Sequence, residues 1–260
     1  MSLFFEERKK VILKTLDRDE KVQVRGLADL LKVSGETIRR DLDRIEKEGM
    51  LKKVYGGAVK AKSSLELPFD EKTGINVLEK RAICKMAASL VEDGDSILIA
   101  HGTTPVEIVR YLGDKNDVTI ITPSIPVLIL SMEVFKGKVI FVGGEYEANQ
   151  KFTSGPLSDN VLQQLKVNKA FVAAGGLSIN DGLSDYDLKG ASSSRKMMQR
   201  VDEAIILADH TKFGKTTFAH ICPLTDISMI ITNKNCSKEW GEVLSENEIE
   251  LLIAESDSSE

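Results

Sequence analysis

The sequence predicts an α/β protein in which a small, mainly helical N-terminal domain precedes a larger domain with a mostly parallel sheet. Three observations predict it. The chain has 260 residues, a length at which a polypeptide usually divides into two domains. Its net charge changes sign after about sixty residues. From about residue 77 onward, short apolar runs alternate with amphipathic segments, which is the pattern of strands and helices that follow one another.

The charge distribution separates the two predicted domains. Residues 1–62 hold 16 of the 35 Lys and Arg residues and 11 of the 40 Asp and Glu residues, so this part carries +5 and the remainder −10, within a total of −5. A basic segment joined to an acidic body is typical of a nucleic-acid-binding module attached to a domain with another task.

Several classes of protein do not fit the composition. No apolar run reaches the ~18 residues of a membrane span, and the first residues lack the pattern of a secretion signal, so we expect a cytoplasmic protein that does not bind membranes. The three cysteines are far apart and form no CxxC pair, which favours free thiols. The three histidines do not stand at metal-ligand spacing from them, so we expect no metal site, and we expect no cofactor.

Three short helices are expected in the N-terminal domain. Apolar residues recur at helical spacing in Arg8–Leu16 and again in Val24–Leu31. The third helix follows Ser34, whose hydroxyl can accept a hydrogen bond from an early backbone amide of the helix. Gly49 is expected to end this helix.

The third helix has a buried face and an outward face. Ile38, Leu42 and Ile45 fall at i, i+4 and i+7 and form the buried stripe. Two helices, a tight turn and a third helix with an arginine-bearing face describe a helix-turn-helix, whose third helix enters the major groove of DNA. An arginine fork suits the two acceptors of guanine and equally suits phosphate. The polar residues offered by the N-terminal half of the helix are Gly35, Glu36, Thr37, Arg39 and Arg40.

A hairpin is expected after the third helix. Residues 50–59 alternate in character around Gly56 and Gly57, which predicts a short β-hairpin, or wing. Lys52 and Lys53 on this wing are expected near the DNA phosphates, where they add affinity and salt dependence but no sequence choice.

The domain boundaries follow from these patterns. We expect a winged helix-turn-helix over residues 1–59 and a linker over residues 60–76, which are polar, lack periodicity and contain Pro68. The second domain then spans residues 77–260.

The second domain is predicted to be Rossmann-like, with helices on both faces of the sheet. Several predicted strands are continuous apolar runs, as expected for strands buried on both faces, and ligands of such sheets bind at the carboxyl ends of the strands. The predicted strands are Ser96–Ala100, Val118–Thr122, Lys138–Val142, Lys169–Ala173, Glu203–Ala208, Ile227–Thr232 and Ile249–Ile253, and the predicted helices between them include Pro105–Leu112, Ile125–Phe135 and Pro156–Leu165.

Small residues follow the first four of these strands, in the runs AHGTTP, TPS, VGG and AAGG. The turn Gly102–Thr104 leads directly into a predicted helix, so its backbone amides and two hydroxyls are expected to cradle a phosphate. Ser124 opens the next helix and either caps it or meets the same anion. The alternative for the Gly-Thr-Thr turn is simple helix capping.

Charged residues cluster after the fourth strand. Asp181, Asp185 and Asp187 fall in one predicted loop, and the latter two are expected to accept hydrogen bonds from ligand hydroxyls. Arg195, on the following helix, and Lys212, after the fifth strand, are expected to pair with an anion. The alternative is that these are turn aspartates and surface cations.

The stretch VRGLADLLKVSGETIRRDLDRIEKEGMLKKVYGGAV resembles the N-terminal signature of the DeoR family of bacterial sugar-metabolism regulators. The resemblance implies that Ser34, Thr37, Arg39 and Arg40 contact DNA, and that Glu36 helps to choose the operator. The matching elements are Leu27-Ala28, Val33-Ser34, Thr37-Ile38-Arg39-Arg40-Asp41-Leu42, Gly49 and Gly56-Gly57.

The resemblance extends through the second domain, where GTT, TPS, VGG, NKAFVAAGG, DGL and ADHTKFG occur in the order of the DeoR-type sensor domain. That domain is related to ribose-5-phosphate isomerase and glucosamine-6-phosphate isomerase-like folds, which implies a non-catalytic site for a phosphorylated sugar or sugar acid. This chain departs from the family pattern at His101, Pro123, Gly190 and Arg195. The expected effector-binding residues are His101, Gly102, Thr103, Thr104, Ser124, Gly143, Gly144, Asp181, Gly182, Asp185, Asp187, Arg195 and Lys212.

The expected function is therefore a DNA-binding repressor of a carbohydrate-catabolism operon, not an enzyme, whose operator affinity a phosphorylated sugar changes by binding linkage. A homodimer or homotetramer is expected, because one helix-turn-helix reads only a few base pairs. The alternative is a sugar-phosphate isomerase with an added DNA-binding domain, in which Asp185 or Asp187 is the base. A dehydrogenase is not supported, because no GxGxxG follows the first strand.

Overall fold

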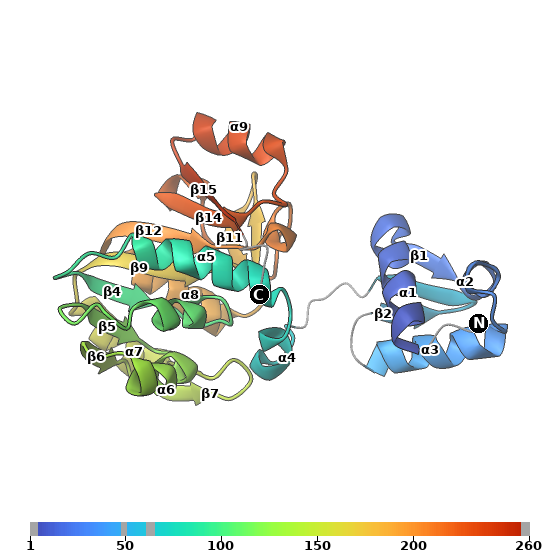
Figure 1. Ribbon diagram of the computed structural model, residues 1–260, viewed down its shortest axis with the longest axis horizontal. Helices are drawn as coiled ribbons and strands as arrows, with labels where there is room; N and C mark the ends of the chain where they lie inside the picture. The colour runs from blue at the N-terminus through green and yellow to red at the C-terminus, as the bar shows by residue number, and fades with distance from the viewer. Residues whose placement is uncertain (1–4, 48–50, 61–65, 256–260) are drawn as a thin grey trace. The chain divides into compact units, whose positions relative to one another are not determined.

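The computed structural model describes residues 5–47, 51–60 and 66–255 of the chain. The chain divides into two compact units, residues 1–66 and 67–260, which Figure 1 colours from blue to red along the sequence. Each unit has its own core, so each is described by itself. The expected helix end at Gly49 lies outside the described residues.

The first unit is a winged helix-turn-helix, as the sequence predicts. Its three strands form an antiparallel sheet in the order β1–β3–β2, and β2 and β3 are the predicted wing. The stripe Ile38, Leu42 and Ile45 of α3 is fully buried in the core of this unit. The elements are α1 (Phe5–Asp19), β1 (Lys21–Gln23), α2 (Val24–Leu31), α3 (Gly35–Lys47), β2 (Leu51–Val54) and β3 (Gly57–Lys60).

Two glycines shape the turn of the wing. Gly56 has a φ of +77°, a left-handed conformation that favours glycine. A Cβ at Gly57 would lie 2.0 Å from the carbonyl oxygen of Val22, so no side chain fits where β3 pairs with β1. The sequence did not predict β1, because three residues with a single buried side chain show no readable period.

The second unit contains a seven-stranded parallel sheet in the order β15–β14–β12–β9–β4–β5–β6. Each strand agrees with a predicted strand to within two residues at either end, so the predicted α/β fold class is confirmed. The strands are β4 (Ser96–Ile99), β5 (Thr119–Thr122), β6 (Lys138–Phe141), β9 (Val167–Ala173), β12 (Val201–Leu207), β14 (Met229–Asn233) and β15 (Glu250–Ala254).

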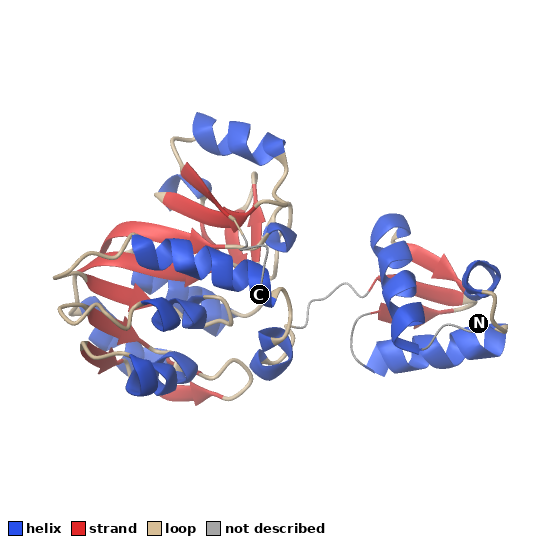
Figure 2. Ribbon diagram, in the orientation of Figure 1, coloured by secondary structure: helices blue, strands red, loops and turns tan. Residues whose placement is uncertain are grey.

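Helices cover both faces of this sheet (Figure 2). On one face α5 (Val77–Ser89) and the 3₁₀ helix η1 (Pro105–Tyr111) pack over a core that includes Ile99 and Phe171. On the other face α8 (Leu188–Met198) packs over a core that includes Val172. The remaining helices are α4 (Phe69–Thr73), α6 (Ile125–Val134), α7 (Gly155–Gln163), η2 (His210–Lys212), η3 (Leu224–Asp226) and α9 (Lys238–Glu246).

Short strands that the sequence did not predict border the main sheet. Asp185, expected in a loop, is the last residue of β11, which pairs with β10 and β13. Three- and four-residue strands depend on tertiary partners and leave no readable alternation in the sequence. The short strands are β7 (Glu145–Glu147), β8 (Phe152–Ser154), β10 (Gly176–Ser178), β11 (Gly182–Asp185) and β13 (Ala219–Cys222).

The expected linker over residues 60–76 is too long at its C-terminal end. Residues 67–76 belong to the second unit. The amide of Phe69 donates to the carbonyl of Asn149 at 2.9 Å, and the side-chain amide of Gln150 donates to the carbonyl of Leu67 at 2.9 Å. Phe69 is buried, so the start of α4 is fastened to the loop between β7 and β8.

The sheet reverses its strand order beside β4. The chain runs from β4 outward through β5 to β6, and β9 then lies on the other side of β4. Open α/β sheets bind ligands at such a switch point, outside the carboxyl ends of the strands. Of the helices in the described residues, none combines the length and the apolar character that crossing a membrane requires.

Candidate effector site and nucleic-acid interface

The turn after β4 lies at the switch point of the sheet. Gly102 has a φ of +121°, and a Cβ at this position would lie 3.0 Å from the Cβ of Ala173 at the end of β9. Thr103 and Thr104 are both buried. The helix expected after this turn is the seven-residue 3₁₀ helix η1, so a phosphate here would rely on the turn amides and threonine hydroxyls rather than on the dipole of a long α-helix.

His101 is held between an aromatic ring and a carboxylate. Its ring stacks on Phe152, with centroids 4.1 Å apart and an interplanar angle of 14°. Its Nε2 lies 3.5 Å from Oδ2 of Asp185, whereas its buried Nδ1 has no hydrogen-bond partner among the described residues. Burial raises the pKa of Asp185, but the hydrogen bond and charge of His101 and the amide of Tyr186 outweigh burial, so that pKa lies below its ordinary value. Asp185 is therefore an ionised partner of His101.

The lack of a side chain at Gly190 leaves room for His101 and Asp185. A Cβ at Gly190 would lie 2.7 Å from Oδ2 of Asp185 and 3.1 Å from Nε2 of His101. His101 and Gly190 are two of the departures from the family pattern, and the structure brings them together. Asp187 lies beside them as the cap of α8, where its carboxylate accepts hydrogen bonds from the amides of Lys189 and Gly190 at 2.8 and 3.0 Å.

Other expected effector residues serve the scaffold. Ser124 caps α6 by accepting from the amide of Val127 at 3.4 Å, which is one of the two roles expected for it. The carbonyl of Gly143 accepts from the hydroxyl of Ser158. Gly144 has a φ of +146°, and a Cβ there would lie 2.4 Å from the carbonyl oxygen of Ser154.

Arg195, expected to pair with an anion, donates hydrogen bonds to two backbone carbonyls. Its Nε donates to the carbonyl of Ile221 at 3.0 Å and its Nη2 to the carbonyl of His220 at 2.5 Å, so the guanidinium ties α8 to β13. Asp181 is exposed and accepts from the hydroxyl of Thr216 at 2.7 Å. Gly182 has a φ of +66° and turns the chain into β11.

Sequence reasoning missed a group of lysines near the switch point. Lys80 is buried, and its ammonium donates to the carbonyl of Lys72 at 2.6 Å. Burial lowers the pKa of Lys80 to about 8; the nearby charge of Asp209 opposes this shift, and those of Lys212 and Lys72 add to it. The signal was present in the sequence, because Lys80 precedes Ile83, Cys84 and Ala87 on the buried stripe of α5.

Two contacts relate these lysines to the candidate residues at the strand ends. The thiol of Cys84, one turn beyond Lys80 on α5, donates to the carbonyl of Thr104 at 3.0 Å. The ammonium of Lys212 lies 5.9 Å from the ring centroid of Tyr186, which follows Asp185. Of the two lysines that the sequence analysis did not select, Lys72 lies on α4 and Lys80 on α5.

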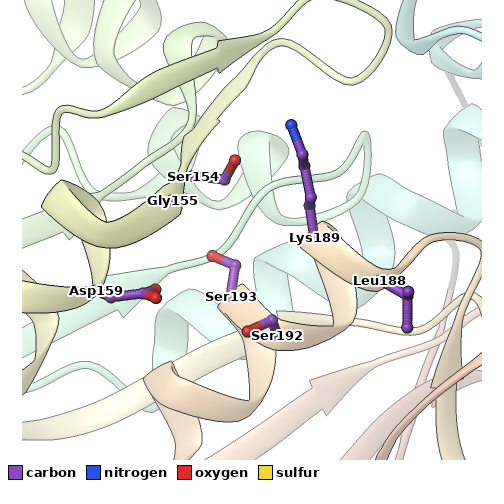
Figure 3. A pocket seen from close by; sticks show the side chains of 7 residues that line it. All are labelled: Ser154, Gly155, Asp159, Leu188, Lys189, Ser192 and Ser193. Atoms are coloured by element: carbon purple, nitrogen blue, oxygen red, sulfur yellow. The ribbon is translucent and has the colours of Figure 1, made fainter.

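A small cavity opens between α7 and α8 (Figure 3). Its volume is about 170 Å³. None of its lining residues was selected from the sequence, because serines in a helix give no functional signal. The lining residues are Ser154, Gly155, Asp159, Leu188, Lys189, Ser192 and Ser193.

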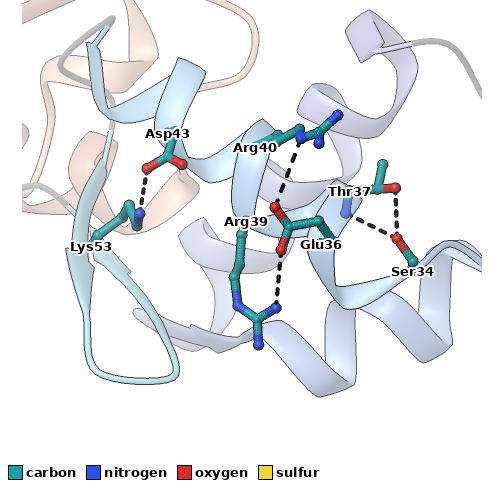
Figure 4. A network of polar contacts seen from close by, with 7 residues as sticks. All are labelled: Ser34, Glu36, Thr37, Arg39, Arg40, Asp43 and Lys53. Carbon is teal, nitrogen blue, oxygen red and sulfur yellow. Dashed lines mark hydrogen bonds and ion pairs between the residues drawn. The ribbon is translucent and has the colours of Figure 1, made fainter.

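In the first unit, α3 begins as predicted. The Ser34 hydroxyl accepts a hydrogen bond from the amide of Thr37 at 3.1 Å and lies 2.9 Å from the Thr37 hydroxyl (Figure 4). This cap satisfies an amide that the helix itself cannot satisfy. Gly35 is the first residue of the helix and is partly buried beside Val24.

The outward face of α3 is open. The side chains of Glu36, Arg39 and Arg40 are 62%, 61% and 78% exposed. Glu36 accepts from Arg39 at 3.4 Å and lies 3.8 Å from Nε of Arg40 (Figure 4). Exposed ion pairs of this length are weak and screened by salt, so they leave both guanidinium groups accessible to a duplex.

A buried ion pair joins α3 to α1. Arg8 of α1 donates from Nε and Nη2 to both carboxylate oxygens of Asp41, at 2.7 and 2.9 Å. Their side chains are only 11% and 4% exposed. The sequence signal was that Asp41 lies within the apolar stripe, at three residues from Ile38.

The two lysines of the wing differ in their contacts. Lys53 on β2 pairs with Asp43 of α3, and its backbone amide donates to Glu46 at 2.7 Å (Figure 4). The hydrogen bond to Asp43 raises the pKa of Lys53. Lys53 therefore ties the wing to α3, whereas Lys52 is exposed on the same strand.

Comparisons with known proteins agree with both units. Residues 8–64 match the DeoR-like helix-turn-helix domain, and residues 75–234 match the DeoR C terminal sensor domain. The chain is 32% identical over 246 residues to the uncharacterized HTH-type transcriptional regulator YulB of Bacillus subtilis, covering 94% of this chain and 95% of that protein. It is 31% identical over 231 residues to the lactose phosphotransferase system repressor of Staphylococcus aureus, covering 86% of this chain and 90% of that protein.

Among solved structures, a ribose 5-phosphate isomerase from Methanocaldococcus jannaschii is similar over 52% of this chain and 53% of its own, with 20% identity and a TM-score of 0.39. The relatives that match nearly the whole chain are named as regulators and repressors, in agreement with the expected regulator and not with the isomerase alternative. Family models cover the helix-turn-helix and the sensor domain alike. The chain therefore belongs to the DeoR family of helix-turn-helix transcriptional regulators.

Proposed function

We propose that this protein represses a carbohydrate-utilisation operon in the cytoplasm, and that a phosphorylated sugar controls its affinity for DNA. The observation that carries the DNA-binding part is the geometry of α3. A buried ion pair with α1 fixes the helix in its unit, and the arginines of its N-terminal half point into solvent. A recognition helix needs this combination of a fixed base and an accessible face.

The contacts with DNA follow from residue chemistry. Arg39 and Arg40 suit guanine edges or phosphates, and the Ser34 and Thr37 hydroxyls suit phosphates beside the helix N-terminus. Glu36 suits the amino group of cytosine, which makes it the residue to choose between operators. We assign contacts with the DNA sugar-phosphate backbone to Lys52 and Gly35 as well. Lys53 can make such a contact only when its ion pair with Asp43 loosens.

Support for the effector comes from the switch point of the sheet. Two buried threonines and a glycine turn stand at the end of β4, and Lys80 and Lys212 bring positive charge to the same region. An anion such as a phosphate would offset the cost of burying the ammonium of Lys80 near the charge of Lys212. The relatives' names support control of sugar genes, because one of them is a repressor of a lactose phosphotransferase system.

The effector would control operator affinity through linkage between the two binding equilibria. An effector that prefers one arrangement of a homodimer or homotetramer changes operator affinity by that preference alone. An oligomer is proposed because two linked helix-turn-helix units read two half-sites and so bind far more tightly than one.

The experiment that tests the proposal is an operator-binding titration. Purified full chain is titrated against labelled duplexes taken from upstream of its own and adjacent genes, with and without a panel of sugar phosphates. We expect sequence-specific binding that one panel member changes at least tenfold. Arg40→Ala should abolish most specific binding, whereas Lys136→Ala, which removes an exposed charge from the second unit, should not. Absence of sequence-specific binding by the wild type would refute the proposal.

A further inference from the structure

The cavity between α7 and α8 has an unsatisfied polar group in its wall. Ser193 is 4% exposed, and its buried hydroxyl has no hydrogen-bond partner among the described residues. Figure 3 shows Ser193 on the side of α8 that faces Ser154 and Asp159 across the cavity. Because buried hydroxyls in native proteins are nearly always hydrogen-bonded, this group lacks a partner, and the cavity is the space that Ser193 adjoins.

The charges around the cavity are already matched. The ammonium of Lys189 donates to Glu147 at 2.5 Å and lies 3.9 Å from Glu145. Asp159 pairs with Lys196. No excess of positive charge remains in these pairs for a phosphate, so the cavity suits a neutral group that both donates and accepts hydrogen bonds.

The hydroxyl content of the wall points to the same chemistry. Three of the seven lining residues are serines, at positions 154, 192 and 193. Ser154 already donates to Glu147 at 3.0 Å, and its oxygen can still accept. The volume of about 170 Å³ is below the roughly 300–1,000 Å³ of sites that enclose a whole drug-sized ligand. The cavity therefore suits one part of a ligand, such as the hydroxylated carbons of a sugar.

Residues of the cavity wall adjoin candidate residues at the strand ends. The carbonyl oxygen of Ser154 lies against Gly144. Leu188 and Lys189 directly follow Asp187, and Gly190, one residue further, lies against Asp185 and His101. A ligand whose phosphate lies at the Gly-Thr-Thr turn can thus extend along α8 toward Ser193.

We propose that this cavity is the subsite for the hydroxyl groups of the sugar effector and that Ser193 selects among sugars by hydrogen bonding to one of them. The proposal rests on the proposed function, because it assumes that the effector is a sugar phosphate. It separates two tasks, with phosphate recognition at the Gly-Thr-Thr turn and sugar recognition at α8.

The test is calorimetric titration of the full chain with inorganic phosphate and with pentose, hexose and hexitol phosphates. The wild type identifies the tightest sugar phosphate, which is then titrated into Ser193→Ala and into Ser245→Ala, a matched control at an exposed helical serine of α9. We expect Ser193→Ala to raise the Kd of that sugar phosphate about tenfold, the loss of one hydrogen bond made in a buried site. The Kd of inorganic phosphate and the melting temperature should stay unchanged, as should both Kd values in Ser245→Ala.

The outcomes separate this proposal from the one on which it rests. Sugar-phosphate binding that Ser193→Ala leaves unchanged overturns the subsite, with a bound water as the partner of Ser193, and leaves the proposed function standing. Equal weakening of inorganic phosphate and sugar phosphate also overturns it, because the substitution then acts on the whole site. If no panel member binds the wild type, the sugar-phosphate effector and the subsite both fail.

Discussion

Replacing Asp41 by Asn should destabilise the winged helix-turn-helix and leave the second unit intact. In the wild type, Arg8 makes two charge-assisted hydrogen bonds to Asp41, at 2.7 and 2.9 Å, and the pair joins α1 to α3. Asn keeps the shape of the side chain but loses its charge and one of its two acceptors. The guanidinium of Arg8, only 11% exposed, then loses the counter-charge of Asp41.

The expected cost can be estimated from these contacts. A hydrogen bond to a charged group contributes about 1.5–3 kcal/mol, and breaking a fully buried ion pair costs about 3–5 kcal/mol. Because Arg8 lies near the edge of a small unit and can turn partly toward water, we expect a loss of about 2–3 kcal/mol. For a domain of this size such a loss lowers the melting temperature by about 10–20 °C.

The assay is differential scanning calorimetry of the full chain, in which the transition of the second unit serves as an internal reference. Asp43→Asn is the matched control, because Asp43 lies on the same helix and pairs with Lys53 at the exposed surface. The double substitution Arg8→Met with Asp41→Leu should recover most of the loss, since apolar residues often replace a buried pair without cost. Equal effects of Asp41→Asn and Asp43→Asn would refute the view that burial gives the Arg8–Asp41 pair its importance.

Three further predictions concern DNA selectivity, pH dependence and coupling. Glu36→Gln removes the carboxylate that pairs with Arg39 and Arg40, so affinity for nonspecific duplex should rise about threefold at low salt, measured by fluorescence anisotropy. The pKa of Lys80 is about 8 in the folded protein against an ordinary 10.5, so the unfolded chain binds this proton more tightly. Stability to urea should therefore rise between pH 8 and pH 10.5, and Lys80→Met should lose that rise. Phe69→Ala loosens the start of α4, so it should reduce the change in operator Kd that the effector causes, while each ligand still binds alone.

Each of these predictions has a contrary outcome. If Glu6→Gln, at an exposed residue of α1, raises nonspecific affinity as much as Glu36→Gln, the effect comes from net charge and not from the pairing on α3. Identical pH dependence of Lys80→Met and wild type would show that the ammonium is solvated. If Leu78→Ala, at an exposed apolar residue of α5, reduces the coupling as much as Phe69→Ala, the loop that holds α4 has no special part in it.

The sequence predicted the strands and helices that hydrophobic periodicity and helix caps indicate. All seven strands of the parallel sheet were predicted from short apolar runs, which in the central strands reflect burial on both faces, and α3 was predicted from its cap and its stripe. The hairpin β7–β8 was missed because its strands have only three residues each and are stabilised by neighbours distant in the sequence. The same limit explains the linker, since the stretch 60–76 as a whole is polar and lacks periodicity, whereas its residues 67–70 are held by the loop at residues 149–151.

The position of the candidate turn was predicted, and its role in binding stays a prediction. Glycine and threonine after a buried strand are typical of a ligand-binding turn, and the structure has residues 102–104 at the end of β4. Arg195 was assigned to an anion because its two carbonyl partners come from β13, 25 and 26 residues away, and no local pattern reveals them. Ser193 was overlooked for a related reason, because an unsatisfied hydroxyl is visible only after the surrounding helices are packed.

The hairpin β7–β8 is where the effector region meets the start of α4. Phe152 on β8 stacks on His101, and Glu147 on β7 holds Lys189 at the cavity. The loop between these strands holds the start of α4, because Asn149 accepts the amide of Phe69. We therefore expect a ligand that moves the ring of His101 or fills the cavity to act on a hairpin that also holds the start of α4. Because α4 is the first helix of the second unit in the chain, we expect a ligand that moves this hairpin to shift α4 as well, and such a differential effect is what linkage between two ligands requires.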